Sequence, residues 1–515
     1  MLTEFKNEAL RDFRSAPVAG EFRANLAAVE KSLGHNYPLL IDGEKIDTEK
    51  KIASINPSLN EQIVGYAAAA TPELAQRAIT AAEEAFPAWA ALRGEERARY
   101  LFKTAAIMRR RRDELSAWMV FEAGKNWAEA DADTCEAIDF LEFYGREAVR
   151  LGGPQQLVRL EGEDNEMYYF PLGVGAVISP WNFPLAITTG MTAAAIVAGN
   201  SVVLKPASTT PVIAAKLVEI MVEAGIPAGV INYLPGSGGV IGDSLVTDPR
   251  IRFINFTGSK EVGLRINELA AKTSPGQRFI KRVVAEMGGK DAIVIDAGTD
   301  LEEAAGVIVA SAFGFQGQKC SACSRVIAHV DIYDELLKIV AAKTKKLILG
   351  PAKDNCHVGP VIDAKALRRI KDYIAQGRQE GRLVLGGESR EDRGGYYVEP
   401  TIIADVSSGA VIAQEEIFGP VLAFIKAEDF SDALTIANST EYGLTGSVFS
   451  GNRRHLEQAR REFEVGNLYF NRKCTGALVG VHPFGGFNMS GTDSKAGGRD
   501  YLLLFSQAKV VSEKF

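Results

Sequence analysis

Short apolar runs rich in β-branched residues alternate with longer amphipathic stretches between residues 168 and 296. Parallel strands must be joined by a crossover of a dozen or more residues, usually a helix, so this alternation predicts βαβ units and a parallel sheet. We expect strands over residues 174–179, 201–204, 230–234, 252–256 and 292–295. We expect helices over residues 187–198, 211–224, 240–246 and 260–272.

Two further blocks flank this one. Ala-rich amphipathic runs at 73–86, 94–121 and 131–151 predict that residues 1–150 are mostly helical. A second alternating block begins near residue 300 and ends near 470, and it predicts a second α/β domain. Its expected strands lie at residues 325–330, 383–385, 421–425 and 446–449. A chain of 515 residues has room for about three such units.

Two strand-like segments, residues 154–170 and 501–511, belong to neither alternating block. We assign them to a small projecting sheet that pairs between subunits, because an unpaired edge strand promotes association. The sequence therefore predicts a homodimer or a larger homo-oligomer.

Composition argues against several classes of partner. The chain has 58 basic and 65 acidic residues and no long Lys/Arg block, so we do not expect nucleic acid to bind. The longest apolar stretches fall far short of the roughly 20 residues that cross a bilayer. The first residues are polar and lack the apolar segment of a signal peptide, which predicts a cytoplasmic protein without a membrane partner.

The cysteines and histidines bear on redox state and metals. Five cysteines are an odd number in a long chain, so we expect reduced thiols, one of which can act as a nucleophile. The five histidines form no His-Glu-x-x-His motif, and the chain has no second Cys-x-x-Cys pair. We therefore expect no catalytic metal.

Cys320 lies in a glycine-rich segment, residues 313–321, that follows a helical run. Glycines let the backbone approach a ligand closely and would place the thiol among free N–H donors. Taken alone, Cys320 is better explained as a buried structural cysteine. The spacing to Cys323 also fits a redox pair, although the residues around redox-active Cys-x-x-Cys motifs are missing here.

Three more segments place polar side chains where strands are expected to end. Glu286 precedes Gly288 and Gly289; partial desolvation there would raise its pKa and suit it to general-base catalysis, whereas by itself it fits a solvated surface residue equally well. Asn182 lies between two prolines, and its amide can donate to an oxyanion. Lys205 ends the next expected strand with a cation.

Gly258 and Ser259 end another expected strand and open a helix, whose N-terminal N–H groups can hold a pyrophosphate. A strand, a glycine-containing turn and a helix form the arrangement that binds dinucleotides at the carboxyl ends of strands. The run at residues 236–242 misses the Gly-x-Gly-x-x-Gly spacing, and we interpret it as a plain turn.

In this order, the segments resemble the aldehyde dehydrogenase family. The match spans nearly the whole chain and rests on residues 180–184, 204–206, 256–259, 286–289, 317–320 and 415–420. The resemblance implies an α/β fold with two Rossmann-related parallel-sheet domains plus a small oligomerisation sheet. It implies a dinucleotide-binding domain over 1–150 and 171–290, a catalytic domain over 291–485, and oligomerisation strands over 151–170 and 490–515.

The resemblance also implies a chemistry. Cys320 attacks the aldehyde, the Asn182 amide and the Cys320 N–H stabilise the oxyanion, and Glu286 activates water to hydrolyse the thioester. The implied cofactor is NAD, with Lys205 on the adenosine ribose, Ser259 on the pyrophosphate, Glu416 on the nicotinamide ribose and Phe418 near the nicotinamide. The full set of implied cofactor contacts is Ser179, Pro180, Trp181, Lys205, Ser208, Gly258, Ser259, Gly288, Glu416 and Phe418. NAD-preferring relatives often have Glu where this chain has Ser208, so NADP stays open.

The loop at residues 471–480, followed by 482–486, resembles the substrate-anchoring loop of the 1-pyrroline-5-carboxylate (L-glutamate γ-semialdehyde) dehydrogenases. This resemblance implies oxidation of that semialdehyde to L-glutamate in proline and arginine catabolism. The N–H groups of Gly476 and Ala477 and the Ser321 hydroxyl would bind the α-carboxylate. The remaining implied contacts are Phe183 and Phe484 with the aliphatic chain and Glu136 with the amine.

Other activities remain open at this point. A succinate semialdehyde dehydrogenase would need an arginine to bind the distal carboxylate, and Arg472 is the candidate in the loop. A CoA-acylating relative would pass the thioester to CoA, which the presence of Glu286 disfavours. A structural protein that kept only cofactor binding is disfavoured by the intact Cys320, Glu286 and Asn182.

Overall fold

The computed structural model describes residues 3–515, and its first large sheet has the strand order β11-β10-β7-β8-β9-β2-β3. The parallel strands are β7 (Val174–Ile178), β8 (Ser201–Lys205), β9 (Ile231–Tyr233), β10 (Ile251–Thr257) and β11 (Arg282–Glu286). At one edge, β2 (Leu39–Ile41) and β3 (Glu44–Ile46) continue the sheet antiparallel. Every residue of β8 and β9 is buried, as expected where helices cover both faces.

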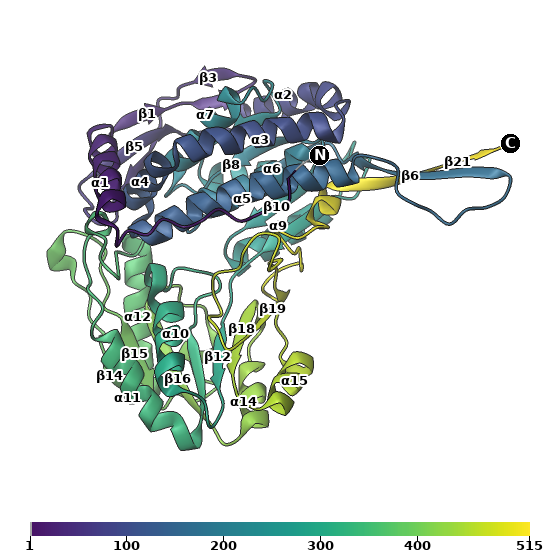
Figure 1. Ribbon diagram of the computed structural model, residues 1–515. Helices are drawn as coiled ribbons and strands as arrows, with labels where there is room; N and C mark the ends of the chain where they lie inside the picture. Colours follow the sequence, from purple (N-terminus) through teal and green to yellow (C-terminus); the bar gives the residue numbers. More distant parts are fainter. Residues whose placement is uncertain (1–2) are drawn as a thin grey trace.

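The second large sheet has the order β14-β15-β16-β13-β12-β18-β19 and lies below the first in Figure 1. Its parallel strands are β12 (Ala292–Ile295), β13 (Arg325–His329), β15 (Thr401–Ala404), β16 (Val421–Ala427), β18 (Thr445–Phe449) and β19 (Asn467–Phe470). β14 (Arg382–Leu385) pairs antiparallel at one edge.

Helices cover both sheets, and several begin at side-chain caps. Thr71, Asn126 and Asp300 each accept a hydrogen bond from a backbone N–H in the first turn of α2, α5 and α10, which satisfies donors that a helix start leaves free. The helices around the first sheet, some of which pack on other helices and not on the sheet itself, are α1 (Ala16–Lys31), α2 (Pro72–Ala90), α3 (Gly94–Arg110), α4 (Arg112–Ala123), α5 (Trp127–Leu151), α6 (Ala186–Val197), α7 (Pro211–Glu223), α8 (Asp243–Thr247) and α9 (Lys260–Ala271). The second sheet carries α10 (Leu301–Phe313), α11 (Tyr333–Thr344), α12 (Ala364–Glu380), α13 (Val411–Gln414), α14 (Phe430–Ala437) and α15 (Arg453–Glu462).

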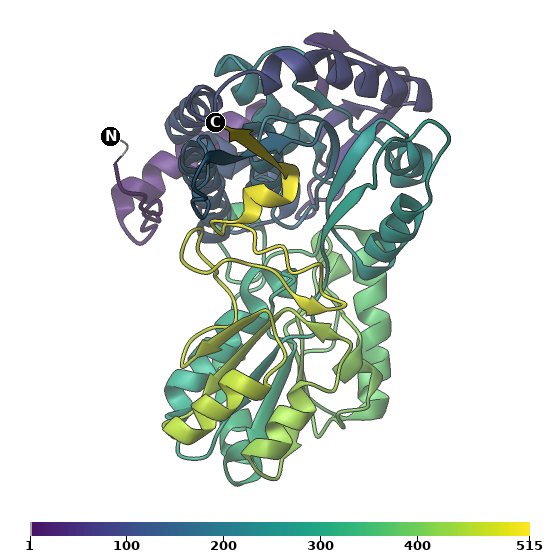
Figure 2. The same ribbon diagram turned by 90° about the vertical axis from the view of Figure 1, so that its right-hand side faces the viewer.

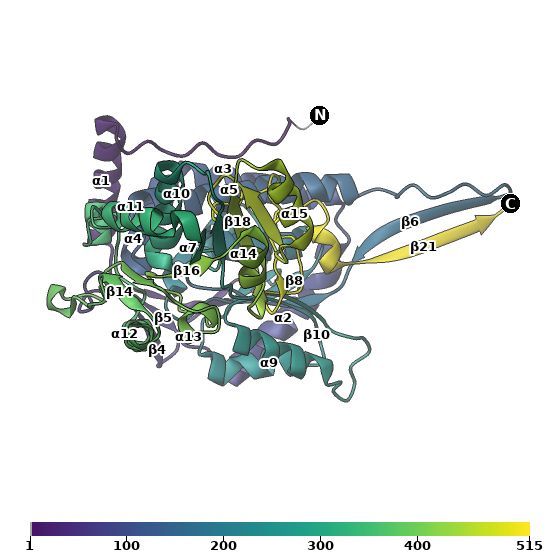
Figure 3. The ribbon, with the colours of Figure 1, turned by 90° about the horizontal axis from the view of Figure 1, so that it is seen from below.

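Two segments far apart in the chain form a separate ribbon. β6 (Glu163–Pro171) pairs antiparallel with β21 (Ser506–Lys514) along its whole length. Figures 1 and 3 both show this ribbon projecting from the rest of the molecule. After Ser506, every residue of β21 is exposed. The strand-like character expected at 154–170 and 501–511 is therefore present in part of each segment, and the two segments pair with each other.

The interpretation of residues 1–150 as mostly helical is wrong between residues 35 and 68. Here the chain forms β2 and β3 and a three-stranded sheet of β1 (His35–Tyr37), β4 (Lys51–Ile55) and β5 (Ile63–Ala68). These strands have three to six residues, too few for a repeating pattern to identify them. The expected helix at 94–121 is divided at Arg111 into α3 and α4.

The run at 292–295, grouped with the first block by its alternation, is the strand β12 in the middle of the second sheet. The first sheet ends instead with β11, which begins with the exposed Arg282 and ends with Glu286, so that only three apolar residues mark it in the sequence. Figure 2 shows the segment after β19 running back from the second sheet toward the first. Among residues 3–515, no helix combines the length and apolar character that a bilayer crossing requires.

Candidate active site

Four parallel strands of the first sheet end in one row. The strand register places Ile178 of β7 beside Lys205 of β8 and beside Phe256 of β10. In the same way, Thr257 of β10 lies beside Glu286 of β11. The segments that follow these strands therefore share one edge of the sheet, at the carboxyl ends where nucleotides bind in α/β proteins.

The second sheet contributes residues that precede its strands, at the amino ends. Cys320 lies five residues before Arg325, the first residue of β13, and Glu416 lies five residues before Val421, the first residue of β16. β12 begins at Ala292, six residues after Glu286. The nucleophile candidate thus comes from the amino ends of one sheet, and Glu286 from a carboxyl end of the other. The rule that ligands bind at the carboxyl ends of parallel strands therefore locates only the residues that come from the first sheet.

The loop before Cys320 has an unusual backbone. Phe315 and Gln316 have φ values of 47° and 57°, a left-handed conformation that costs about 1–3 kcal/mol for a residue with a side chain. Buried contacts hold it, because the Gln316 side-chain amide donates to the carbonyl of Pro360 at 2.8 Å. Gly317 is also left-handed, and a Cβ there would collide with the carbonyl of Gly419. These contacts fix the path of the chain into Cys320.

Asn182 reaches this loop from the first sheet. Its side chain is 5% exposed, and its Nδ2 donates to the backbone carbonyl of Gln318 at 3.2 Å. The amide therefore lies against the peptide chain two residues before Cys320. A side-chain amide beside a nucleophile is the donor that a developing oxyanion requires.

The Cys320 thiol is half-buried among acidic groups. Burial, together with the negative charges of Asp291, Glu416 and Glu286, raises its pKa well above that of a free cysteine. The resting group is therefore a protonated thiol, and a base must take its proton before it attacks. A Cβ placed on Gly289, three residues after Glu286, would lie 2.7 Å from the carbonyl oxygen of Cys320, so the backbone that follows Glu286 passes next to Cys320.

Glu286 is suited to act as a general base toward a water molecule. Burial raises its pKa from 4.5 to about 7, although hydrogen bonds from Ser494 and from the backbone of Gly486 oppose the shift. One carboxylate oxygen, Oε1, accepts from the Ser494 hydroxyl. Within the described part of the chain, Oε2 has no hydrogen-bond partner. A carboxylate that titrates near neutrality with one free oxygen can take a proton from a thiol or a water. Sequence reasoning missed Ser494, because it lies in a segment with no strand end or motif.

The residues expected to hold the adenosine half of a dinucleotide lie along the row of strand ends. Burial lowers the pKa of Lys205 to about 8. Its ammonium donates one long hydrogen bond, to the carbonyl of Pro206 at 3.4 Å, so its other N–H groups can donate to hydroxyl groups of a ligand. Ser208 donates to the carbonyl of Gly236 at 3.3 Å in the turn after β8. Ser259 caps α9 by accepting a hydrogen bond from the N–H of Val262, and the other N–H groups at this helix start suit a phosphate.

The residues expected around the nicotinamide ribose come from the second sheet. Glu416 lies directly over Gly288, where a Cβ would collide with its carboxylate, and it accepts from Gly289 N at 3.2 Å. Burial raises its pKa to about 7. The rings of Trp181 and Phe418 meet edge to face with centroids 5.3 Å apart. A carboxylate beside two aromatic rings fits a ribose joined to a flat, weakly polar ring. The other two expected contacts, Ser179 and Pro180, precede Trp181 in the chain, Ser179 being buried and Pro180 half-buried.

The expected anchor loop, residues 471–480, docks beside the nucleophile. The Cys474 thiol donates to the carbonyl of Ser321 at 3.4 Å, which ties the loop to the residue after Cys320. Arg472 Nη2 donates at 3.1 Å to the carbonyls of both Thr475 and Gly476. Arg472 thus binds the carbonyl side of the turn, and the N–H groups on its other side are available to an anion. Arg472 is used inside the loop, which disfavours the succinate semialdehyde hypothesis.

The two aromatic side chains expected around the substrate chain have different surroundings. Phe183 packs against Phe315 of the nucleophile loop, with ring centroids 6.4 Å apart. Phe484 is half-buried, and its backbone pairs with Ala496. Ala477, the second expected anchor residue, is also half-buried.

A buried charged group that sequence reasoning missed supports Phe183. The Lys125 ammonium lies 4.0 Å from the ring centroids of both Phe183 and Phe315, a cation–π arrangement, and 3.2 Å from Asp133. Both charged side chains are fully buried. Glu136 lies on the same helix, α5, and burial plus the charge of Asp133 raises its pKa to about 8. Because Lys125 lies between α4 and α5 near many other charged residues, no local pattern singles it out.

The sequence and the fold of the chain match those of known proteins. The model of the aldehyde dehydrogenase family matches residues 45–511. The chain belongs to this family. The expectation of an aldehyde dehydrogenase with the family's α/β fold is therefore confirmed.

This aldehyde dehydrogenase has close relatives of full length. It is 59% identical over 516 residues to the 1-pyrroline-5-carboxylate dehydrogenase of Geobacillus kaustophilus, and the alignment covers all of both chains. A structure of 1-pyrroline-5-carboxylate dehydrogenase from Thermus with bound NAD is 51% identical, covers 100% of both chains and superposes with a TM-score of 0.99. Proline utilization A from Bdellovibrio bacteriovorus is 45% identical, with a TM-score of 0.97, over 99% of this chain and 53% of the longer protein.

Proposed function

We propose that this aldehyde dehydrogenase oxidises L-glutamate γ-semialdehyde, the open form of 1-pyrroline-5-carboxylate, to L-glutamate, with NAD as the oxidant. The reaction belongs to proline and arginine catabolism. The names of the full-length relatives support the substrate, and the NAD in the Thermus structure supports the cofactor. The observation that carries the chemistry is the Asn182 amide against the Cys320 loop, with the free oxygen of Glu286 on the same site.

The first step is attack by sulfur. The thiol of Cys320 first loses its proton to solvent water, which leaves the carboxylate of Glu286 unprotonated for the hydrolysis step. The sulfur then forms a bond to the aldehyde carbon, and the carbonyl oxygen becomes an oxyanion. Asn182 Nδ2 and the Cys320 N–H donate to that oxygen.

The second step converts the tetrahedral adduct to a thioester. Bound NAD supplies the acceptor for the hydride that leaves the former aldehyde carbon. Trp181, Phe418 and Glu416 orient the acceptor ring and its ribose, and Lys205 and Ser259 hold the adenosine half. We assign most of the dinucleotide binding to residues 1–150 and 171–290. Residues 291–485 carry the nucleophile and also contribute Glu416 and Phe418 to the nicotinamide end.

The third step releases the acid. Glu286 takes a proton from water, the resulting hydroxide attacks the thioester carbon, and the C–S bond breaks to give L-glutamate and free Cys320. Its Oε2 is buried and has no protein partner among the described residues, which leaves this oxygen available to accept that proton.

Substrate selection rests on the two ends of the amino acid. We assign the α-carboxylate to the N–H groups of Gly476 and Ala477 and to the Ser321 hydroxyl. We assign the α-ammonium to Glu136, because an adjacent cation would lower its raised pKa and favour the carboxylate. The rings of Phe183 and Phe484 border the methylene chain.

A panel of aldehydes with NAD and with NADP tests the proposal. The expected result is a kcat/KM for L-glutamate γ-semialdehyde at least tenfold above that for succinate semialdehyde, with no requirement for CoA. A preference for succinate semialdehyde, or steady NADH production that requires CoA and yields an acyl-CoA in place of the acid, would overturn it.

We propose that the ribbon of β6 and β21 joins subunits of a homo-oligomer, because its outer edges carry unpaired backbone groups. Deletion of residues 506–515 should then give a smaller species in light scattering than the full chain. An unchanged mass would contradict this role.

A further inference from the structure

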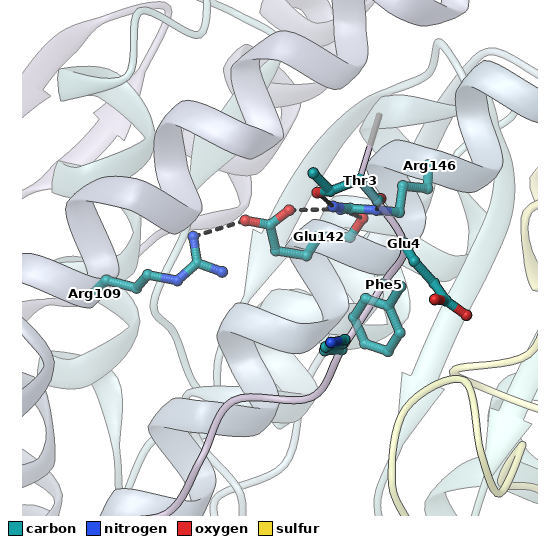
Figure 4. Close-up of a pocket in the computed structure, with 7 residues that line it drawn as sticks. Thr3, Glu4, Phe5, Arg109, Glu142 and Arg146 are labelled. Atoms are coloured by element: carbon teal, nitrogen blue, oxygen red, sulfur yellow. Dashed lines mark hydrogen bonds and ion pairs between the residues drawn. The ribbon is translucent and has the colours of Figure 1, made fainter. Parts of the chain in front are cut away.

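The N-terminal arm, residues 3–14, crosses the helices of the first sheet as an extended segment. Arg146 of α5 donates to the carbonyl of Thr3 at 3.1 Å, and Arg109 of α3 pairs with Glu8 at 2.6 Å. Figure 4 shows Thr3 and Phe5 lying beside Arg109, Glu142 and Arg146 of these helices. The arm is therefore fixed at several points along α3 and α5.

Asn7 connects this arm to the anchor loop. Its side-chain Nδ2 donates both to Asp139 Oδ2 of α5 at 2.9 Å and to the carbonyl of Val479 at 3.0 Å. The second oxygen of Asp139 accepts from Glu8 N at 2.8 Å. Asp139 is 4% exposed, so its hydrogen bonds have little competition from water. One amide thus links α5 to the loop.

Phe5 makes a second contact with the same loop. Its ring meets that of Phe143 edge to face, with centroids 5.2 Å apart. A Cβ placed on Gly480 would lie 3.0 Å from the Phe143 ring and 3.2 Å from the Phe5 ring, so both rings cover the backbone there. The end of the anchor loop is packed under the arm, while Cys474 ties its beginning to Ser321.

The position of Asn7 bears on substrate geometry. Asp139 lies three residues after Glu136 on α5, and the two share one side of the helix. In the proposed function, Glu136 binds the α-ammonium and the anchor loop binds the α-carboxylate. Both groups are attached to one carbon of the substrate, so the separation of α5 from the loop must match an amino acid.

We propose that the arm is a positioning element of the substrate site, and that Asn7 sets the distance between α5 and the anchor loop so that an α-amino acid carboxylate fits. The inference rests on the proposed function. It makes Asn7 a specificity-determining residue that touches no reacting atom. Simple aldehydes, which have no carboxylate, do not depend on it.

Asn7→Ala tests this inference against the full-length wild-type enzyme. We expect a five- to tenfold higher KM for L-glutamate γ-semialdehyde, which corresponds to the loss of about one hydrogen bond, with kcat within twofold. The inhibition constant of L-glutamate, the product, should rise by the same factor. The kcat/KM for propanal should stay within twofold, because the chemical step is untouched.

Glu8→Gln provides a matched control. It removes the ion pair of the arm with Arg109 but leaves both hydrogen bonds of Asn7 in place, so its KM should equal that of the wild type. Asn7→Asp keeps the size of the side chain but puts a carboxylate beside Asp139, and it should raise KM at least as much as Asn7→Ala.

Three results would overturn the inference. These are an unchanged KM in Asn7→Ala, an equal loss with propanal, or an equal effect of Glu8→Gln. A wild-type enzyme that oxidises propanal but not L-glutamate γ-semialdehyde would overturn the proposed function itself, and the inference with it. Wild-type activity on the semialdehyde with an unaffected Asn7→Ala would overturn the inference alone.

Discussion

The side-chain amide of Asn182 donates to the backbone carbonyl of Gln318 at 3.2 Å, although 136 positions of the chain separate the two residues. Asn182 follows a strand of the first sheet, and Gln318 precedes a strand of the second. The oxyanion donor and the nucleophile loop therefore meet only when the two sheets have assembled. Such a preorganised donor stabilises charge in the transition state without reorganisation during the reaction.

Asn182→Ala should lower kcat for the semialdehyde by about 100- to 1000-fold, the usual effect of removing one oxyanion donor. Steady-state kinetics measures the loss. Cofactor affinity, followed by fluorescence titration with NADH, should stay within twofold because Asn182 is not assigned to the dinucleotide. A decrease in kcat of less than tenfold would show that the amide does not stabilise the oxyanion.

Hydrolysis of the thioester should depend on pH through Glu286. Burial raises its pKa to about 7, so the carboxylate form increases as pH rises through 7 and is lost below it. The deacylation rate in single-turnover experiments should fall about tenfold for each pH unit well below 7 and level off above it. A rate that stays constant from pH 5 to pH 8 would exclude Glu286 as the base.

Particular residues show which parts of the site could be located from the sequence alone. Asn182, Glu286 and Cys320 all lie next to strand ends with glycine or proline around them, and their order along the chain resembles that of the family. Lys125 and Ser494 gave no such signal. Their roles depend on tertiary contacts, to two phenylalanine rings and to a distant carboxylate, which no local pattern encodes.

The fold likewise contains elements that the sequence predicts and elements that it does not. Most parallel strands of the two large sheets have enough apolar residues to be recognised, as at 201–204 for β8, whereas β11, β15 and β19 are absent from the expected strands. The strands between residues 35 and 68 are short and become ordered by pairing with neighbours. Likewise, the arm around Asn7 has no periodic pattern, and its structure comes from hydrogen bonds to residues more than 100 positions away.

Lys125→Met should destabilise the enzyme strongly. The substitution leaves Asp133 without its cation in a fully buried site, which typically costs about 3–5 kcal/mol. Denaturation in urea, followed by tryptophan fluorescence, should show a lower midpoint. Lys272→Met, which removes an exposed pair with Glu268, is the control and should leave the midpoint unchanged. Equal midpoints for the two variants would contradict a structural role for the buried pair.

Ser208→Glu should alter the choice of cofactor. A carboxylate in the turn after β8 would repel the 2′-phosphate of NADP, and a repulsion of about 1.4 kcal/mol lowers affinity tenfold. We expect kcat/KM with NADP to fall at least tenfold while the value with NAD changes by less than threefold. Ser208→Gln, which adds bulk without charge, should have a smaller effect on NADP. Parallel losses with both cofactors would place residue 208 away from the 2′ position.

The central claim, that the substrate becomes covalently bound to Cys320, is tested most directly with the Glu286→Gln variant. This variant should give a rapid burst of NADH without steady turnover when it is mixed with NAD and L-glutamate γ-semialdehyde. Mass spectrometry of the quenched protein should then find a glutamyl acyl group on the peptide that contains Cys320. Absence of the adduct, or its attachment to another cysteine, would contradict the account.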